Sequence, residues 1–280
     1  MRKPSKLKRL VVLQNIARDF ARKTAKVIAT KAREQKIEVI ELESFGGPIK
    51  TPDIFAADMI IACGGDGTII EAAHRSRGSN IPIAGVNAGY LGFLSAFSAK
   101  NQAELLVGIK KLFQGDYTIE YRAAIEALGM WAVNDIVIQR SGDTFIDLQL
   151  LIDGAVATDY RGDGLIISTP TGSTAYSLAA GGPVLTSGNQ SVVLTPICPH
   201  SFANRSVIIS GSEKIEVRCN ENSKLPAQVY VDGQQRKIRP GTKLGIGLSK
   251  NPMPLISLTA TNRHAILAEK LGWKPLPQNL

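Results

Sequence analysis

The chain has 280 residues, 44% of them hydrophobic, and carries a net charge of +9. This length suits one large domain or two modest ones with a buried core, and no apolar run approaches the roughly 20 residues of a membrane span. The three cysteines are far apart and form no C-x-x-C pair, which argues against a disulfide or zinc framework. We therefore expect a cytoplasmic protein without a membrane partner.

Lysines and arginines concentrate in the first 36 residues. A solvated helix face is the simplest interpretation of this charge, and a polyanionic ligand such as a nucleotide is the second. Aromatic residues are not interleaved with the basic ones as they are in many nucleic-acid-binding surfaces, so we expect no nucleic-acid partner.

The first 115 residues predict alternating strands and helices. Short apolar runs that suit buried strands lie at Leu10–Leu13, Ile37–Ile40, Met59–Ala62 and Ile81–Val86. Apolar residues at helical spacing cover 16–35, with Asn15 as the expected N-cap, and 103–113, which Gly115 closes. This alternation favours an α/β domain with a parallel sheet.

From about residue 117 the pattern changes to short strands separated by turn signals. The expected strands are 117–128, 131–138, 145–152, 164–168, 191–196, 206–209, 214–218, 228–232 and 243–248. Helical character returns near 174–180 and again at 262–271. We therefore expect an α/β domain over 1–116 and an all-β, sandwich-like domain over 117–255. The C-terminal segment 256–280 is expected to pack back on the N-terminal domain.

A glycine turn, Gly64-Gly65-Asp66-Gly67-Thr68, lies between the strand at Met59–Ala62 and the next helical segment. Strand, glycine turn and helix in this order aim backbone N–H groups and a helix N-terminus at a phosphate. A carboxylate inside such a turn needs a separate reason. Asp66 could bind a metal, accept a proton from a hydroxyl, hydrogen-bond a sugar, or close the turn. Neither a Walker sequence nor G-x-G-x-x-G is present, so a P-loop NTPase and a standard Rossmann dehydrogenase are not supported.

Several separated motifs resemble those of the NAD kinase family and follow in the family's order. They are Gly64–Thr68, Asn87–Leu94, Val133-Asn134-Asp135, Asp163–Pro183, Pro199-His200-Ser201 and Val231–Gln234. The run Asp163–Pro183 is the most specific, whereas Gly64–Thr68 alone also resembles diacylglycerol and sphingosine kinases. The family's architecture, an α/β domain followed by a β-sandwich-like domain, matches the change of pattern near residue 116.

The resemblance implies transfer of a phosphoryl group from ATP or polyphosphate to the 2′-hydroxyl of the adenosine ribose of NAD. Asp66 would accept the proton of that hydroxyl or hold it in line, while Gly64, Gly65, Gly67 and Thr68 bind the donor phosphates. Because there is no Walker lysine, Mg²⁺ would neutralise phosphate charge, with no direct ligation by protein side chains. The family also implies a homodimer or a homotetramer.

The same resemblance implies an NAD site that extends into the β-rich region. Asn134 and Asp135 combine hydrogen-bond donors and acceptors that suit a ribose diol or an amide, and plain turn residues are the alternative. The residues implied to contact NAD are Asp66, Gly67, Asn134, Asp135, Arg161, Asp163, Thr174, Ala175, Tyr176, Ser177, Leu178, Ala179 and Gln234. Ala179 lacks the hydroxyl that the family commonly has there, and Asp135 is shorter than the glutamate often found at its position.

Two other functions fit part of the sequence. A lipid kinase would share the glycine turn but would leave Asp163–Pro183 unexplained. A non-catalytic NAD sensor would share the fold, but Asp66, Asn134 and Asp135 are all present and nothing in them points to lost activity. A kinase that makes NADP is therefore the function that we expect.

Overall fold

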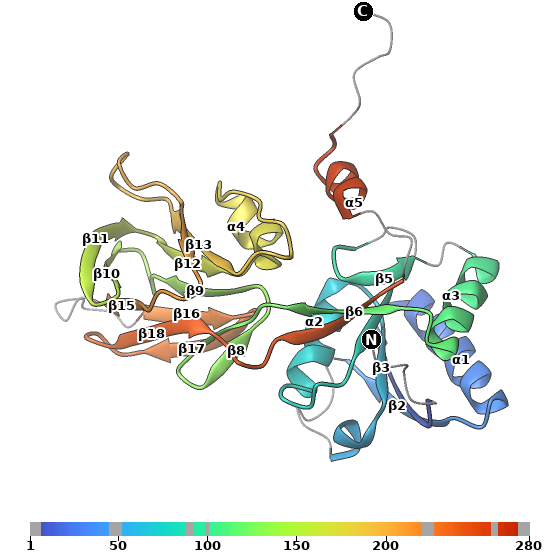
Figure 1. The fold of residues 1–280 in the computed structure, drawn as a ribbon. Helices are drawn as coiled ribbons and strands as arrows, with labels where there is room; N and C mark the ends of the chain where they lie inside the picture. The colour runs from blue at the N-terminus through green and yellow to red at the C-terminus, as the bar shows by residue number, and fades with distance from the viewer. Residues whose placement is uncertain are drawn as a thin grey trace, which may run out of the picture. The chain divides into compact units, whose positions relative to one another are not determined.

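The computed structural model describes residues 7–44, 52–87, 92–98, 101–219, 227–258 and 263–273. The chain divides into two compact units (Figure 1). Unit 1 consists of Met1–Tyr121 and Met253–Leu280, and unit 2 of Arg122–Pro252. Residues 117–121 and 253–255, which we expected in the β-rich domain, thus fall in unit 1, because the strands there join its sheet.

Unit 1 is built on a seven-stranded sheet with the order β2-β1-β3-β4-β19-β6, and β5 also pairs with β4. The strands are β1 (Arg9–Gln14), β2 (Glu38–Glu43), β3 (Met59–Cys63), β4 (Ile83–Asn87), β5 (Ser95–Ser98), β6 (Thr118–Arg122) and β19 (Met253–Ser257). The pairs β1–β2, β1–β3, β3–β4 and β4–β19 are parallel, which confirms the predicted α/β domain. β19 confirms the predicted return of the chain to this domain. Within the expected returning segment, 259–262 and 274–280 lie outside the described residues.

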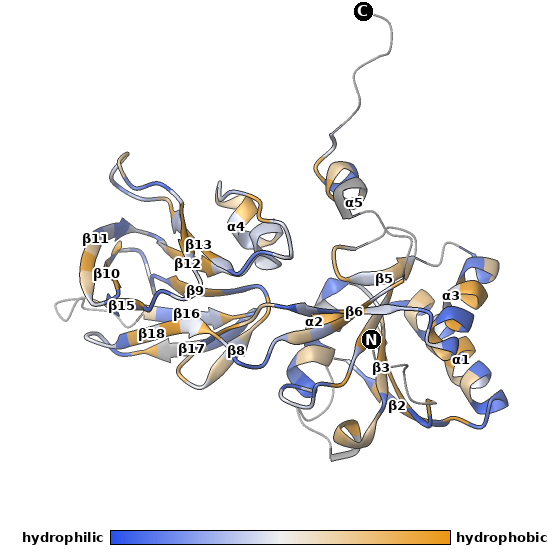
Figure 2. Cartoon of the chain, viewed as in Figure 1, coloured by the Kyte–Doolittle hydropathy of each residue, from blue (hydrophilic) through white to orange (hydrophobic). Residues whose placement is uncertain are grey.

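Helices cover both faces of this sheet (Figure 1). The helices on the sheet are α1 (Asp19–Glu34), α2 (Asp66–Arg75) and α3 (Gln102–Gln114). Unit 1 also contains the 3₁₀ turn η1 (Pro52–Ala56) and, near the C-terminus, α5 (Arg263–Lys270). Ile28 of α1 and Ile109 of α3 share one buried cluster with Val12 of β1, so these two helices cover the same face. α2 covers the other face, where Ile69 lies directly against Gly85 of β4. Figure 2 shows hydrophobic residues along β3 and both kinds of residue on α1 and α3, as expected for amphipathic helices on an apolar sheet.

The predicted cap at the end of α3 is confirmed, and the predicted cap at the start of α1 is wrong. α3 ends at Gly115, which has φ 75° and closes the helix as predicted. The predicted N-cap Asn15 is wrong, because α1 begins at Asp19 with Arg18 as its N-cap. The Asn15 side chain instead accepts a hydrogen bond from the Ala17 N–H at 3.1 Å, which closes a turn before the helix.

None of the helices in the described ranges is long and apolar enough to cross a membrane.

Unit 2 is a sandwich of two six-stranded sheets, with the orders β11-β10-β15-β18-β7-β8 and β14-β13-β12-β9-β16-β17. The strands are β7 (Ile125–Ala127), β8 (Met130–Ala132), β9 (Asp135–Gln139), β10 (Ile146–Ile152), β11 (Ala155–Gly162), β12 (Gly164–Ser168), β13 (Ser191–Ile197), β14 (Val207–Ser210), β15 (Ile215–Cys219), β16 (Ala227–Val231), β17 (Gln234–Ile238) and β18 (Lys243–Leu248). Ile136 and Ile138 of β9 share one buried cluster with Leu148 and Leu150 of β10, so alternate residues of both sheets point inward. This confirms the predicted sandwich-like domain.

Two strands of unit 2 were not predicted, and both lie at the edge of a sheet. Most residues of β11 are exposed, and β17 reads Gln-Gln-Arg-Lys-Ile. An edge strand needs little burial, so neither segment has the apolar alternation that identifies a strand. The helix expected near 174–180 is present as η2 (Gly172–Thr174) and α4 (Tyr176–Ala179). Ala180, which follows α4, packs on the outward side chains Val137 and Ile166 of the second sheet.

Candidate active site

The glycine turn carries the chain from β3 directly into α2. The Gly64 N–H donates to the Val86 carbonyl at 3.0 Å, so Gly64 still belongs to the sheet edge. A methyl group at Gly64 would lie 2.3 Å from Thr68 Oγ1, and only glycine lets the first helical turn approach the strand so closely. Thr68 is 1% exposed, so its hydroxyl lies inside the turn rather than at the surface. Contact between this hydroxyl and a donor phosphate stays a prediction.

Asp66 is the first residue of α2, and the second glycine-rich motif holds its carboxylate. The N–H groups of Phe93 and Leu94 donate to the carboxylate at 3.2 and 3.4 Å. A methyl group at Gly92 would lie 2.2 Å from Asp66 Oδ1, so this position must be glycine for the contact to form. Residues 88–91 of the same motif lie outside the described residues. Sequence motifs predicted separately therefore meet at one carboxylate, and Gly92 is a site residue that the sequence analysis missed.

The remaining glycines of the turn face open space. A methyl group at Gly65 or Gly67 would meet no described atom within 4 Å. The N–H groups of Asp66 and Gly67 precede the first bonds of the helix, which Thr68 and Ile69 donate to the Gly65 carbonyl. Backbone donors, small residues and the positive end of a helix together suit an anion.

Asn134 and Asp135 lie where the chain enters β9, directly against the start of the specific 163–183 run. The Thr169 N–H donates to the Asn134 carbonyl at 2.9 Å, and the Thr169 hydroxyl donates to the Val133 carbonyl. A methyl group at Gly172 would lie 2.0 Å from the Asn134 carbonyl oxygen, so the two backbones are in direct contact. The structure thus brings together residues of two motifs, and the hydrogen-bond partners Thr169 and Val133 are 36 residues apart in the sequence.

Asp135 has an unusual environment for a carboxyl group. It is 7% exposed and stands opposite Ser168 in the pair β9–β12. Burial, and then the negative charge of Asp232, raise the pKa of Asp135 to about 7. At neutral pH the carboxyl is therefore present both in its neutral form, which donates a hydrogen bond, and in its ionised form, which only accepts. A group of this kind suits a ligand that offers donors and acceptors together.

Buried hydroxyls hold the run that ends in α4. The Ser173 hydroxyl accepts from the Leu185 N–H at 2.9 Å, and the hydroxyls of Ser177 and Thr195 bond at 2.9 Å. A methyl group at Gly182 would lie 2.3 Å from the Ser177 hydroxyl oxygen. Ser177 was predicted to contact NAD, but its hydroxyl is fully buried and directed to Thr195. A contact through its backbone stays a prediction.

The other predicted contacts of this run lie nearer the surface of unit 2. Tyr176 is 40% exposed, Thr174, Ala175 and Leu178 are half-buried, and Ala179 is exposed. The hydroxyl network below them fixes the backbone of η2 and α4, and the Ala175 N–H donates to the Gly172 carbonyl at 2.8 Å. The side chains of this group are the parts that a ligand could reach. Their contact with NAD stays a prediction.

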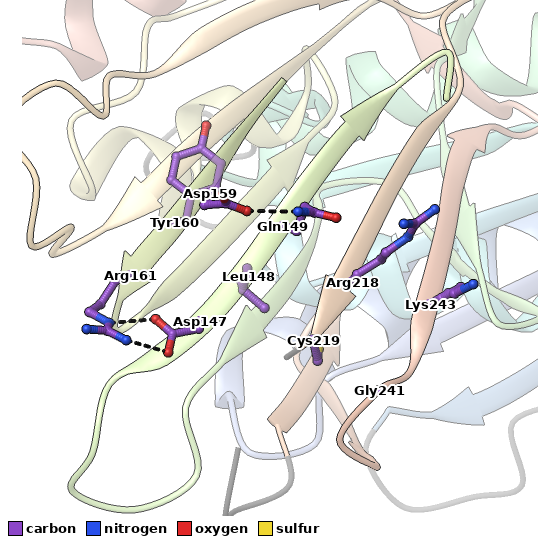
Figure 3. A pocket seen from close by; sticks show the side chains of 10 residues that line it. All are labelled: Asp147, Leu148, Gln149, Asp159, Tyr160, Arg161, Arg218, Cys219, Gly241 and Lys243. Carbon is purple, nitrogen blue, oxygen red and sulfur yellow. Dashed lines mark hydrogen bonds and ion pairs between the residues drawn. The ribbon is translucent and has the colours of Figure 1, made fainter. Parts of the chain in front are cut away.

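Arg161 and Asp163 have different surroundings although only Gly162 separates them. Arg161 lines a groove of about 650 Å³ on the β11-β10-β15-β18 sheet (Figure 3). Its guanidinium binds the Asp147 carboxylate through two hydrogen bonds of 2.6 and 2.8 Å. Asp163 lies between β11 and β12, where the chain passes to the other sheet, and pairs with Arg140 at 2.7 Å. Both charges are thus already partnered within unit 2, and binding to NAD would compete with these pairs.

Gln234 is exposed at the start of β17, directly after the Asp232-Gly233 turn. Each unit therefore holds one group of predicted residues. Unit 1 brings Asp66 together with the glycines at 64, 65, 67 and 92, and unit 2 brings the Asn134–Asp135 pair together with the run that leads into α4. Within the described ranges, no group of three or more His, Cys, Asp or Glu side chains could hold a metal ion.

Comparison with known proteins gives a consistent result for both units. The family model of the ATP-NAD kinase N-terminal domain matches residues 14–117, and that of the ATP-NAD kinase C-terminal domain matches residues 133–258. An NAD kinase of Caldicellulosiruptor saccharolyticus is 33% identical, with 93% of this chain and 98% of the relative covered. An NAD kinase of Lachnoclostridium phytofermentans is 38% identical, with 76% of this chain and 80% of the relative covered.

Solved structures agree on the fold. An NAD kinase from Archaeoglobus fulgidus, in complex with ATP, is 28% identical and has a TM-score of 0.77, with 96% of this chain and 100% of that chain covered. Yeast NADH kinase, in complex with NADH, has a TM-score of 0.84 with 99% of this chain and 91% of that chain covered; at 22% identity this likeness concerns the fold alone. The predicted order of an α/β domain and a β-rich domain is thereby confirmed.

Proposed function

The chain belongs to the NAD kinase family, and we propose that it transfers a phosphoryl group from ATP to the 2′-hydroxyl of the adenosine ribose of NAD, which gives NADP. ATP is the proposed donor because the Archaeoglobus relative was solved in complex with it. Inorganic polyphosphate is the alternative donor. Diacylglycerol and sphingosine are not proposed as acceptors, because both family models and the relatives named above concern NAD kinases.

One observation carries the proposal: the Asp66 carboxylate is held by the N–H groups of Phe93 and Leu94 while the turn around it stays open. Phosphoryl transfer depends on positioning and charge stabilisation more than on covalent chemistry. As the hydroxyl oxygen forms its bond to phosphorus and the bond to the leaving ADP breaks, the hydroxyl proton becomes acidic. Asp66 accepts that proton, and its fixed orientation keeps the hydroxyl in line.

The donor phosphates are assigned to the start of α2. The N–H groups of Asp66 and Gly67 and the positive end of the helix supply attraction without a lysine. The open surfaces of Gly65 and Gly67 allow a phosphate to reach the backbone. Mg²⁺, when bound to the phosphates, would neutralise part of their charge. Since the described residues offer no three-residue metal cluster, this ion is assigned to the substrate phosphates and not to a protein cage.

The dinucleotide is assigned to unit 2. Asn134 and Asp135 offer donors and acceptors to a ribose or an amide, and the surface residues around Tyr176 offer a ring and N–H groups to a base. Asp163 and Gln234 complete the assignment as polar contacts. Arg161 is the weakest member of the set, because NAD would have to replace its bidentate pair with Asp147.

The test is formation of NADP from NAD, ATP and Mg²⁺ by the purified protein, read with an NADP-specific dehydrogenase. Parallel reactions replace ATP by polyphosphate, or NAD by a diacylglycerol or sphingosine. Asp66→Asn should lower kcat at least about 100-fold, the lower range for a lost general base. No NADP with either donor would contradict the proposed function, and binding of NAD without turnover would favour the sensor.

Asp19→Asn is the matched control. Asp19 is also the first residue of a helix, but it is exposed and pairs only with surface residues such as Arg22 and Lys23. Exposed ion pairs contribute little to stability, and Asp19 contacts none of the proposed site residues, so this variant should keep full activity. Equal losses in both variants would contradict a specific role for Asp66.

We further propose a homodimer or homotetramer in the cytoplasm. The three cysteines are free thiols, two of them buried, as expected for a reducing compartment. Light scattering after gel filtration tests the assembly, and a mass near 30.0 kDa, that of one chain, would contradict it.

A further inference from the structure

The turn between β16 and β17 lies beside the proposed NAD site, yet its acidic residue was not among the predicted contacts. Asp232 and Gly233 have φ values of 46° and 80°. Two consecutive positive φ values are typical of a type I′ turn, which joins antiparallel strands through two residues. Asp-Gly is one of the pairs that suit such a turn, but the Asp232 carboxylate also makes contacts outside the turn.

The Asp232 carboxylate accepts hydrogen bonds from three consecutive backbone N–H groups across the sheet. Val133, Asn134 and Asp135 donate to it at 2.7, 2.8 and 3.2 Å. In return, the Asp232 N–H donates to the Asp135 carbonyl at 3.1 Å. Bonds from N–H groups to a carboxylate are stronger than those to a neutral oxygen, so this side chain fixes the backbone at the entrance to β9.

Two of these three residues are held from the opposite side by Thr169, which donates to the carbonyls of Val133 and Asn134. Segment 133–135 is therefore clamped between the hairpin and the 163–183 run. Its backbone N–H groups are occupied by Asp232, and two of its carbonyls by Thr169. The side chains of Asn134 and Asp135 are the parts of this segment that remain to bind a ligand.

We propose that Asp232 is a positioning residue for NAD: its carboxylate holds the backbone of 133–135 so that the Asn134 and Asp135 side chains meet the dinucleotide in the correct orientation. Asp232 itself need not touch NAD. The inference rests on the proposed role of Asn134 and Asp135 in NAD binding.

Asp232 also sets the charge of this pair. Burial and the nearby Asp232 carboxylate raise the pKa of Asp135 to about 7. Among the elements packed against β9, β12 places the neutral Ser168 opposite Asp135. β7 carries Glu126, whose carboxylate accepts a hydrogen bond from Ser249. Removal of the charge at position 232 therefore lowers the pKa of Asp135, although burial still keeps it above its usual value.

The experiment compares Asp232→Asn with Asp153→Asn in the full-length protein. Asp153 is a matched control: it has φ 49° in the Asp153-Gly154 turn between β10 and β11, and its carboxylate accepts from the Lys214 N–H at 2.9 Å. Asp232→Asn should raise the KM for NAD about tenfold, the effect of losing about 1.4 kcal/mol of binding. The KM for ATP should stay within about twofold. Asp153→Asn should change neither constant.

The pH dependence of the KM for NAD separates a positioning role of Asp232 from a purely structural one, because loss of a structural contact alone would not shift its midpoint. In the wild type, the KM for NAD should change with a midpoint near pH 7, the pKa of Asp135. In Asp232→Asn the midpoint should move to lower pH, and in Asp135→Asn the transition should disappear. An unchanged KM for NAD in a folded Asp232→Asn protein, or an unchanged midpoint, would overturn the proposal.

If Asp232→Asn does not fold, Asp232→Glu decides, because it keeps the charge but displaces the oxygens. It should raise the KM for NAD and retain a midpoint near pH 7, and a wild-type KM would overturn the proposal. Failure of the proposed function would look different. The wild type would then form no NADP, or Asn134→Ala and Asp135→Asn would leave the KM for NAD unchanged.

Discussion

The two units use the same interaction, a carboxylate that accepts backbone N–H groups, for opposite purposes. In unit 1 the N–H groups of Phe93 and Leu94 position the Asp66 carboxylate, which is the proposed reactive group. In unit 2 the Asp232 carboxylate positions the backbone, and the neighbouring side chains are the proposed binding groups. An aspartate in a glycine-rich turn can therefore be either the group that is held or the group that holds. Only the contacts distinguish the two cases.

The largest effect should come from Gly92→Ala, which displaces the Asp66 carboxylate but leaves the residue itself unchanged. The new methyl group would lie 2.2 Å from Asp66 Oδ1, and the end of this side chain can move away while the fold remains. A displaced base loses most of its contribution, so kcat should fall by about 10³-fold, within the range for general-base catalysis. The measurement is steady-state kinetics together with thermal unfolding.

Gly247→Ala in β18 is the control for Gly92→Ala, because a methyl group there would meet no described atom within 4 Å. It should keep full activity. If Gly92→Ala also kept full activity, the contact with Phe93 and Leu94 would not be what makes Asp66 functional. The conclusion that backbone N–H groups position the reactive carboxylate of unit 1 would then be wrong.

Asp135→Asn tests the other unit through the pH dependence of stability. The pKa of Asp135 is raised from 3.8 to about 7 in the folded state, so the folded chain binds this proton more tightly than the unfolded chain. The contribution of Asp135 to stability is therefore fully present below about pH 4 and is lost as the pH rises through about 7. Asp135→Asn removes the titrating group, so the variant does not lose this stability as the pH rises. Relative to the wild type, its free energy of unfolding should rise by a few kcal/mol between about pH 4 and pH 8.

Urea denaturation at a series of pH values measures this difference. Asp147→Asn is the contrasting control, because the hydrogen bond from Arg161 holds the pKa of Asp147 below its usual range. Asp147 therefore stays charged from pH 5 to 8, and its replacement should shift stability by the same amount throughout that interval. A difference between Asp135→Asn and wild type that did not depend on pH would mean that Asp135 titrates normally.

Much of the fold could be predicted from the sequence because its signals are local. The buried strands of unit 1 are short apolar runs, Gly115 ends α3, and turn residues separate the strands of unit 2. The edge strands β11 and β17 lack such signals because exposed edges tolerate polar residues. The start of α1 was misplaced because Asn15 closes a turn as readily as it caps a helix.

The candidate site was predicted as separate motifs, and its assembly was not. No spacing rule indicates that Gly92 lies against Asp66, or that Gly172 lies against the Asn134 carbonyl. Asp232 was interpreted first as a turn residue, since Asp-Gly is a common hairpin signal. Its second role depends on contacts 97 to 99 residues away in the sequence. Contacts of this range follow from the tertiary structure, and local patterns carry no information about them.

The smallest effect should come from Gly67→Ala, which asks whether glycine at this position serves the fold or the ligand. Gly67 is exposed in the first turn of α2, and a methyl group there would meet no described atom within 4 Å. Alanine favours the helix over glycine, so the protein should become more stable by about 0.4–1 kcal/mol. The added methyl group would nevertheless narrow the approach of a phosphate to the backbone N–H groups, and the KM for ATP should rise about threefold, the equivalent of roughly 0.7 kcal/mol. The KM for NAD should stay constant, and Gly247→Ala should change neither KM. A Gly67→Ala protein that gained stability and kept its KM for ATP would show that donor phosphates do not approach the backbone at Gly67.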